Sequence, residues 1–510
     1  MKSYRKLLAF LMACSMMLGT LATGCSQAES GSSGSGDGGQ SGGDTKPAET
    51  VELDWYIGGT PQEKQDDVFA DINEILVDKL NTKVDFHYID FNSYGQQMQM
   101  LMTSGEKIDM MYTSNWANDF YSDVSKGAYQ EIDMEMVKEY GPNIMKEVPE
   151  TVWKGAVVNG KTYAIPNIQV LARWPAMVVQ KKYIDKYNFD PSTVKGLDDF
   201  TDLFEQIAKN EDGISPVRLI KNSGVLSLYI SNMGLEYFSE TNPLGIRIDD
   251  PDLKIVNLYE TEEMKNYLNI LRDWYNKGII RKDAASVTDV SAEFANGKIA
   301  SFFAVNNPDM LPGQAATMGL KPEDLTVITL SDPYLSTSAV VATMTAINAK
   351  TTNAKECIQV LNEFFDSEDT RVQNLLSFGI EGVNYNKVED DLIEMLPNTG
   401  YTENCGWAHG SLFNCFRIDA SQPSWRPTGP DINAEATVSP MMGFNFDPSP
   451  VKNELAQVAA VMDEFAPTLQ TGSADVDETL AQMNEKLEQA GLANLQKEMQ
   501  KQLDEWKAQQ

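Results

Sequence analysis

The chain has 510 residues, and its 74 aspartates and glutamates outnumber 41 lysines and arginines to give a formal net charge of −33. This charge excludes a nucleic-acid-binding function, because no basic face is available to release phosphate counterions. Only two histidines are present, and residues 51–510, beyond the glycine- and serine-rich stretch, have no P-loop, GxSxG, HExxH, EF-hand or GxGxxG pattern. Catalysis is therefore disfavoured, although a glycosidase with two carboxylates would need no histidine.

Residues 1–24 have the composition of a signal peptide. Basic residues precede the apolar run Leu7–Leu21, which is shorter than the ~20 residues that a transmembrane helix requires. The run leads to Ala22-Thr23-Gly24-Cys25, and small residues before a cysteine are typical of a lipobox. We expect lipidation of Cys25 with a diacylglycerol. Cys14 would leave an apolar run of only a few residues, and an ordinary signal peptide with an incidental cysteine is the other alternative.

Residues 25–50 are rich in glycine, serine and other polar residues. Such a segment cannot bury enough apolar surface to fold, so it predicts a flexible linker. A coil of about 25 residues has a root-mean-square reach of roughly 25–30 Å. The sequence therefore predicts a folded body held near the outer face of the cell membrane by the lipid anchor alone.

Residues 51–510 are too many for one hydrophobic core, so we expect two lobes. Alternating and periodic apolar residues predict strands at 51–57, 83–88 and 108–112, with helices at about 61–80 and 94–104 between them. Alternating strands and helices predict a parallel, doubly wound α/β sheet. Ligands of such sheets bind in the loops at the carboxyl ends of the strands.

Further elements follow along the chain. Residues 159–166 predict a hairpin turned at Gly160, and helices are expected at about 180–187, 196–210 and 261–277. Asp475 is better explained as a helix cap than as part of a calcium loop, since the glycine and the distal ligand of such a loop are missing. The apolar stripe from Leu492 to Trp506 predicts a final helix that packs on its own lobe, although it could also dimerise.

The three cysteines beyond the leader are Cys357, Cys405 and Cys415. An odd number in an exported chain leaves at least one free thiol. Cys405 and Cys415 could pair, but the spacing does not decide this. No zinc or other metal pattern is present.

Several stretches together resemble one family. They are Asp109-Met110-Met111-Tyr112-Thr113-Ser114-Asn115-Trp116, Lys161-Thr162-Tyr163-Ala164-Ile165-Pro166, Gly297-Lys298-Ile299-Ala300, Ala346-Ile347-Asn348-Ala349-Lys350, Gly379-Ile380-Glu381-Gly382-Val383-Asn384-Tyr385, and the tail from Gly443 to Trp506. In this order and spacing they resemble the family 1 extracellular solute-binding proteins of ABC importers. The closest likeness is to a Gram-positive oligosaccharide-binding lipoprotein branch with an extra C-terminal helical region.

The resemblance implies a two-lobed, type II periplasmic-binding-protein-like α/β fold, with the ligand in a cleft between hinged lobes. Residues 51–166 and 336–385 would form the first lobe. Residues 167–335 and 386–510 would form the second, with the helical region from about 440. It implies a monomer that delivers a carbohydrate, an oligosaccharide in that branch, to the transmembrane subunits of an ABC permease. It implies no cofactor, no metal and no catalysis.

Candidate ligand contacts combine aromatic and polar side chains in the loops where such a cleft would lie, since sugars present apolar C–H faces as well as hydroxyls. Packing in the core or the hinge is the alternative for each. The candidates are Thr60, Thr113, Ser114, Asn115, Trp116, Asn167, Gln169, Arg173, Trp174, Phe303, Asn306, Asn307, Tyr401, Trp407 and His409. Two other functions stay open: a binder of another small ligand such as a peptide, and a surface carbohydrate-active enzyme.

Overall fold

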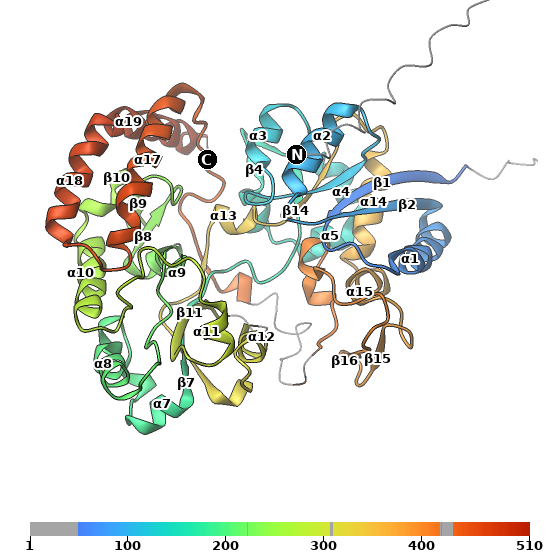
Figure 1. The fold of residues 1–510 in the computed structure, drawn as a ribbon. Helices are drawn as coiled ribbons and strands as arrows, with labels where there is room; N and C mark the ends of the chain where they lie inside the picture. The colour runs from blue at the N-terminus through green and yellow to red at the C-terminus, as the bar shows by residue number, and fades with distance from the viewer. Residues whose placement is uncertain (1–48, 222, 307–309, 419, 421–431, 510) are drawn as a thin grey trace, which may run out of the picture. The chain divides into compact units, whose positions relative to one another are not determined.

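The computed structural model describes residues 49–221, 223–306, 310–418, 420 and 432–509. These residues form two lobes, each with its own hydrophobic core (Figure 1). The predicted signal peptide, Cys25 and most of the predicted linker lie outside the described residues, as does Asn307. Among the described residues, every helix is too short or too polar to cross a bilayer.

The first lobe is built on a five-stranded sheet with the order β2-β1-β3-β14-β6. Its strands are β1 (Val51–Gly58), β2 (Thr82–Ile89), β3 (Met110–Thr113), β14 (Met344–Ile347) and β6 (Ala164–Pro166). The first three are parallel and are connected by α1 (Gln65–Leu80) and α2 (Tyr94–Ser104). This part of the sheet follows the predicted strand, helix, strand, helix, strand order.

Helix α1 shows why the sequence forms these elements. Its first turn carries Asp66 and Asp67, whose charges stabilise the helix amino terminus. The spacing of Val68, Ile72 and Leu76 places all three on the buried face. The helix ends where Asn81 adopts a left-handed conformation, with φ of 50°.

The other side of the sheet is not parallel as predicted. Strand β14 pairs antiparallel with both β3 and β6, so the sheet is mixed. All four residues of β14 are buried, and its sequence therefore lacks the polar alternation of a strand with one exposed face. Both faces of this inserted strand lie in the core.

The second lobe contains two three-stranded sheets, in the orders β11-β7-β12 and β10-β9-β8. The strands are β7 (Pro175–Gln180), β8 (Leu235–Tyr237), β9 (Leu244–Arg247), β10 (Val256–Asn257), β11 (Ser301–Val305) and β12 (Leu325–Thr329). Helices α7 (Lys181–Lys186), α8 (Thr201–Asn210) and α10 (Glu262–Asn276) confirm the three helices predicted in this region. In α10, Met264, Leu268 and Leu271 are buried at helical spacing.

The remaining elements surround these sheets. In the first lobe they are α3 (Phe120–Ser125), α4 (Met134–Tyr140), α5 (Pro142–Glu147), α6 (Glu150–Gly155), β4 (Val157–Val158), β5 (Lys161–Thr162), α14 (Ala354–Phe364), α15 (Arg371–Phe378), β15 (Tyr385–Lys387) and β16 (Ile393–Met395). In the second lobe they include α9 (Val225–Tyr229), α11 (Ser291–Ala295) and α12 (Met310–Thr317). Connecting segments contain β13 (Tyr334–Leu335), α13 (Thr337–Val340) and β17 (Thr437–Val438).

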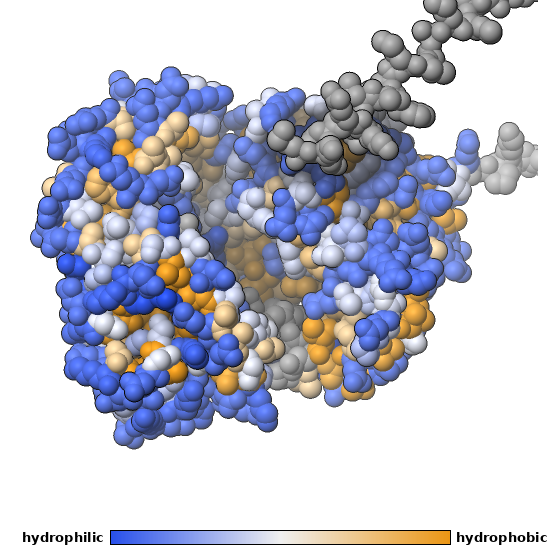
Figure 2. Space-filling view, in the orientation of Figure 1, coloured by the Kyte–Doolittle hydropathy of each residue, from blue (hydrophilic) through white to orange (hydrophobic). Residues whose placement is uncertain are grey.

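The C-terminal region consists of α17 (Lys452–Leu469), α18 (Val476–Gln489) and α19 (Leu492–Lys507). Leu495, Met499 and Leu503 of α19 are fully buried in the core of the second lobe, which confirms that this stripe packs on its own lobe. Asp475 accepts a hydrogen bond from the Glu478 amide at 3.1 Å, as predicted for a helix cap. The visible surface of these helices is mostly hydrophilic (Figure 2).

Candidate functional site

Three aromatic side chains gather beside the carboxyl ends of β2 and β3. Phe91 follows β2, Trp116 follows β3, and Trp407 comes from the 3-10 helix Gly406–Ala408. The Phe91 ring centroid lies 5.0 Å from that of Trp116 and 5.2 Å from that of Trp407, with which it stacks. The two tryptophan rings are 6.0 Å apart. We call Phe91, Trp116 and Trp407 the aromatic platform.

Trp116 is held in place while its ring stays open to solvent. Its indole N–H donates to the carbonyl of Ala342 at 2.8 Å, yet 53% of the residue is exposed. Tryptophan rings are usually buried in a core. A ring that is anchored and yet exposed at a strand end is typical of a binding surface. Its neighbour Asn115 is also exposed, and the Asn115 amide donates to the carbonyl of Ser338 at 3.0 Å.

Trp407 is anchored through its backbone. Its carbonyl accepts from the Thr343 hydroxyl at 3.1 Å. Three residues earlier, the Asn404 side chain accepts from the Thr60 amide at 3.1 Å and donates to the Thr60 carbonyl at 3.0 Å. These bonds hold the exposed Thr60 loop, at the end of β1, beside the segment that carries Trp407.

Gly58 is required at the end of β1 by the position of Phe91. A Cβ atom at Gly58 would lie 2.1 Å from the Phe91 ring, a distance that no side chain can accommodate. The glycine therefore allows the ring to cover the end of the strand and to contact both tryptophans. Phe91 was not among the sequence candidates, although it follows a strand end by the same rule that indicated Trp116.

Thr113 and Ser114 are fully buried next to the platform. The Thr113 hydroxyl lies 3.0 Å from that of Tyr129, and the Ser114 hydroxyl accepts from the Ala117 amide at 2.9 Å. These bonds fix the turn on which Asn115 and Trp116 stand. The structure thus places Thr113 and Ser114 beneath the exposed surface.

Asn167, like Thr113 and Ser114, lies beneath the exposed surface. It is fully buried, and its amide donates to the Ala408 carbonyl at 2.8 Å and to the Thr343 hydroxyl at 3.1 Å. Its side-chain oxygen accepts from the Thr345 hydroxyl at 3.1 Å. Asn167 therefore joins β14 to the segment of Trp407.

Tyr401 and His409 are buried in the first lobe. The Tyr401 hydroxyl donates to the Leu376 carbonyl at 2.7 Å, and burial raises the pKa of this hydroxyl. Burial lowers the pKa of His409 to about 3, so its imidazole is neutral. Neither residue is exposed, although both were predicted to lie in loops at the cleft.

Arg173, Trp174, Phe303 and Asn306 lie at one end of the sheet of β7. The backbones of Arg173 and Tyr334 exchange two hydrogen bonds, and the Asn306 amide donates to the Trp174 carbonyl at 2.6 Å. Trp174, Asn306 and Phe303 are half-buried. Gln169 is also half-buried, and its carbonyl accepts from the Asn433 amide at 2.7 Å.

Charged side chains elsewhere in the first lobe form a candidate metal site. Asp54, Asp85 and His87 are the one group of metal-type ligands found among the described residues. The ammonium of Lys107 lies 2.6 Å from the Asp54 carboxylate and already neutralises it.

Cys405, whose pairing the sequence left open, is a free thiol.

The chain is 26% identical over 460 residues to the carbohydrate ABC transporter substrate-binding protein of Streptococcus pneumoniae, covering 89% of this chain and 90% of the relative. Its structure is similar to that of the N-glycan transport solute binding protein (NgtS) from the same organism. The TM-score is 0.77 at 24% identity, covering 89% of this chain and 98% of NgtS. The chain has a solute-binding-protein fold.

A second structure of that protein, in complex with Man1GlcNAc, matches with a TM-score of 0.67 at 23% identity, over 89% of this chain and 99% of that chain. The family described as a domain of unknown function (DUF3502) matches residues 440–508, which contain α17, α18 and α19. These findings confirm the resemblance to the solute-binding proteins of carbohydrate ABC importers and the two-lobed α/β fold predicted from the sequence.

Proposed function

We propose that this protein is the solute-binding component of an ABC importer and that it captures an oligosaccharide. Contacts from both lobes would stabilise a closed form by hinge bending, and the permease would receive the ligand from that form. The observation that carries the proposal is the aromatic platform, with Trp116 exposed at the carboxyl edge of a parallel strand. The relative that it resembles is a carbohydrate transport protein.

A sugar suits this surface better than a peptide does. The C–H face of a pyranose packs on an aromatic ring, and its hydroxyls need neutral polar partners at the rim. Thr60 and Asn115 lie at that rim and are exposed. A peptide site would instead hold backbone amides and the charged termini.

The ligand class that we propose is the mannose- and N-acetylglucosamine-containing oligosaccharides. Support comes from the likeness to NgtS, whose structures include complexes with Man1GlcNAc and Man5GlcNAc. Titration calorimetry with these two sugars, and with pentaalanine as the peptide, tests the proposal. We expect both sugars to bind with one site per chain. Binding of the peptide, or of none of the three, would contradict it.

Binding is expected to leave the sugar unchanged. The relatives are solute-binding proteins, which supports binding without catalysis. Purified protein should therefore return Man5GlcNAc intact after prolonged incubation, as measured by mass spectrometry. Steady production of a shorter sugar, absent from a heat-denatured control, would show that the protein is an enzyme.

We also propose that the protein is a monomeric lipoprotein on the outer face of the cell membrane, anchored through Cys25. The supporting pattern is Ala22-Thr23-Gly24-Cys25, followed by a polar linker. Cys25→Ser should appear in the medium without lipid, while Cys14→Ser should stay with the membrane fraction. Incorporation of labelled fatty acid into the Cys25→Ser variant would contradict this assignment.

A further inference from the structure

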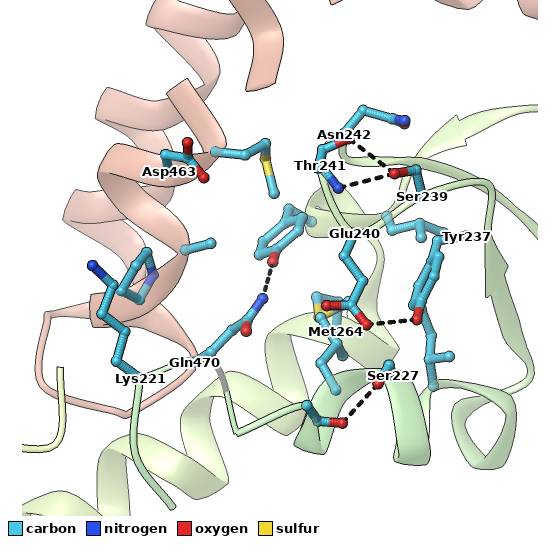
Figure 3. A pocket seen from close by; sticks show the side chains of 18 residues that line it. Lys221, Ser227, Tyr237, Ser239, Glu240, Thr241, Asn242, Met264, Asp463 and Gln470 are labelled. Atoms are coloured by element: carbon cyan, nitrogen blue, oxygen red, sulfur yellow. Dashed lines mark hydrogen bonds between the residues drawn. The ribbon is translucent and has the colours of Figure 1, made fainter. Parts of the chain in front are cut away.

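The second lobe contains a cavity of about 460 Å³ that is separate from the aromatic platform. It lies between α9, the turn from β8 to β9, and α17 of the C-terminal region (Figure 3). Its volume falls in the range of small-molecule sites, which is about 300–1,000 Å³. Arg272 of α10 holds the turn that follows α17, since it donates to the carbonyls of Gly472 and Ser473 at 3.1 Å each.

The cavity combines an apolar floor with a polar rim. Leu226, Ile230, Leu258 and Met264 contribute to the floor. On the rim, the Tyr237 hydroxyl donates to the Glu240 carboxylate at 3.1 Å, and the Gln470 amide donates to the Tyr259 hydroxyl at 2.8 Å. Ser239, Thr241 and Asn242 line one side, and Asp463 and Gln470 line the other (Figure 3).

This lining has the chemistry of a neutral sugar site. Hydroxyl, amide and carboxylate groups can bind the hydroxyls of a sugar, and the two tyrosines and the aliphatic floor can cover its C–H faces. Two carboxylates, Glu240 and Asp463, stand against the single ammonium of Lys221. Because the negative charges outnumber the positive one, the lining disfavours an anionic ligand.

The cavity adjoins the segments that connect the lobes. A smaller hollow shares Ser227, Ile230 and Tyr237 with it and is also lined by Arg173, Tyr334, Ser336 and Ser338. Ser338 is the residue whose carbonyl accepts the amide of Asn115, the neighbour of Trp116. A series of adjoining polar groups therefore leads from the edge of the platform to the cavity.

We propose that this cavity is a distal subsite, which binds sugar units at the end of an oligosaccharide whose other end lies on the aromatic platform. The inference rests on the proposed carbohydrate-binding function and adds a length requirement to it. It also gives the C-terminal region a role, because α17 forms one wall of the subsite. On this proposal a disaccharide occupies the platform alone, whereas a longer sugar also occupies the cavity.

Ala466→Phe tests the subsite, because Ala466 lines the cavity from α17 and a phenyl ring there would occupy it. We expect the variant to weaken Man5GlcNAc binding at least tenfold and to change Man1GlcNAc binding less than twofold in titration calorimetry. The matched control is Ala460→Phe, on the exposed side of the same helix, which should affect neither sugar. Glu240→Gln, a substitution of an exposed side chain, provides a second variant if Ala466→Phe does not fold.

The outcomes separate the two proposals. If the wild-type protein binds neither sugar, the proposed function fails and the subsite fails with it. If the wild type binds both sugars and neither cavity variant discriminates between them, the function stands and the distal subsite is wrong. Equal weakening of both sugars by a folded variant would also overturn the subsite, since it would indicate an indirect effect on the platform.

Discussion

Trp116→Ala should weaken oligosaccharide binding about tenfold or more while leaving the protein folded. An aromatic contact contributes on the order of 1 kcal/mol beyond area burial, and about 1.4 kcal/mol corresponds to tenfold in affinity. Because 53% of Trp116 is exposed, its removal takes little from the core. The substitution also deletes the bond of the indole N–H to the Ala342 carbonyl. Titration calorimetry with Man1GlcNAc measures the effect.

Trp506→Ala is the matched control for this substitution. Trp506 is half-buried on α19, and its ring lies 5.8 Å from that of Phe444 in an edge-to-face contact. Its truncation should lower the melting temperature through lost packing and leave affinity nearly unchanged. If Trp116→Ala binds normally and Trp506→Ala does not at equal foldedness, the C-terminal helices and not the platform bind the ligand.

The free energy of unfolding should decrease by about 2 kcal/mol between pH 7 and pH 5 because of His409 alone. Burial lowers the pKa of this residue in the folded state to about 3, and its Nδ1 atom has no hydrogen-bond partner among the described residues. An unfolded histidine has a pKa near 6.5, so below that pH the unfolded chain binds a proton that the folded chain does not. The contribution of neutral His409 to the free energy of unfolding is thus complete above pH 6.5 and is lost progressively as the pH falls toward 3.

Urea unfolding of His409→Phe at several pH values measures this contribution. The phenyl ring keeps the edge-to-face contact with Phe364 and removes the titrating group. The variant should show a smaller loss of stability between pH 7 and pH 5 than the wild type, with His409→Leu as an alternative if the phenyl ring does not fit. Identical slopes in all proteins would contradict the assignment to His409.

The strands and helices of the first half of the sheet were predictable because each has a local signature. Alternation in β1 and β2 and the apolar face of α1 follow from one exposed side and one buried side. Strand β14 was not predicted as a partner of β3 because its pairing depends on residues far along the chain. The Met344–Ile347 stretch is apolar throughout, and a short apolar run does not reveal its neighbours or its direction.

The candidate site was predictable in part for the same reason. Trp116 could be identified because it lies in the loop three residues after the end of β3, and the structure brings it together with Trp407 and the Thr60 loop. The burial of Tyr401 and His409 could not be foreseen, since an irregular segment has no period from which an inner face can be read. The cavity in the second lobe was missed altogether, because α9 and α17, more than 200 residues apart in the sequence, meet only in the folded lobe.

The insertion of β14 between β3 and β6 affects the order in which the protein can fold. A chain is synthesised from its amino terminus, yet Tyr112 beside this strand donates to a carbonyl 230 residues later, at Ala342. The second lobe likewise needs Leu495, Met499 and Leu503 from its last helix to complete its core. Contacts of such long range form slowly, so neither lobe can close while most of the chain is being made. The first lobe therefore completes its sheet only after β14 has been made, and the second lobe completes its core only after α19 has been made.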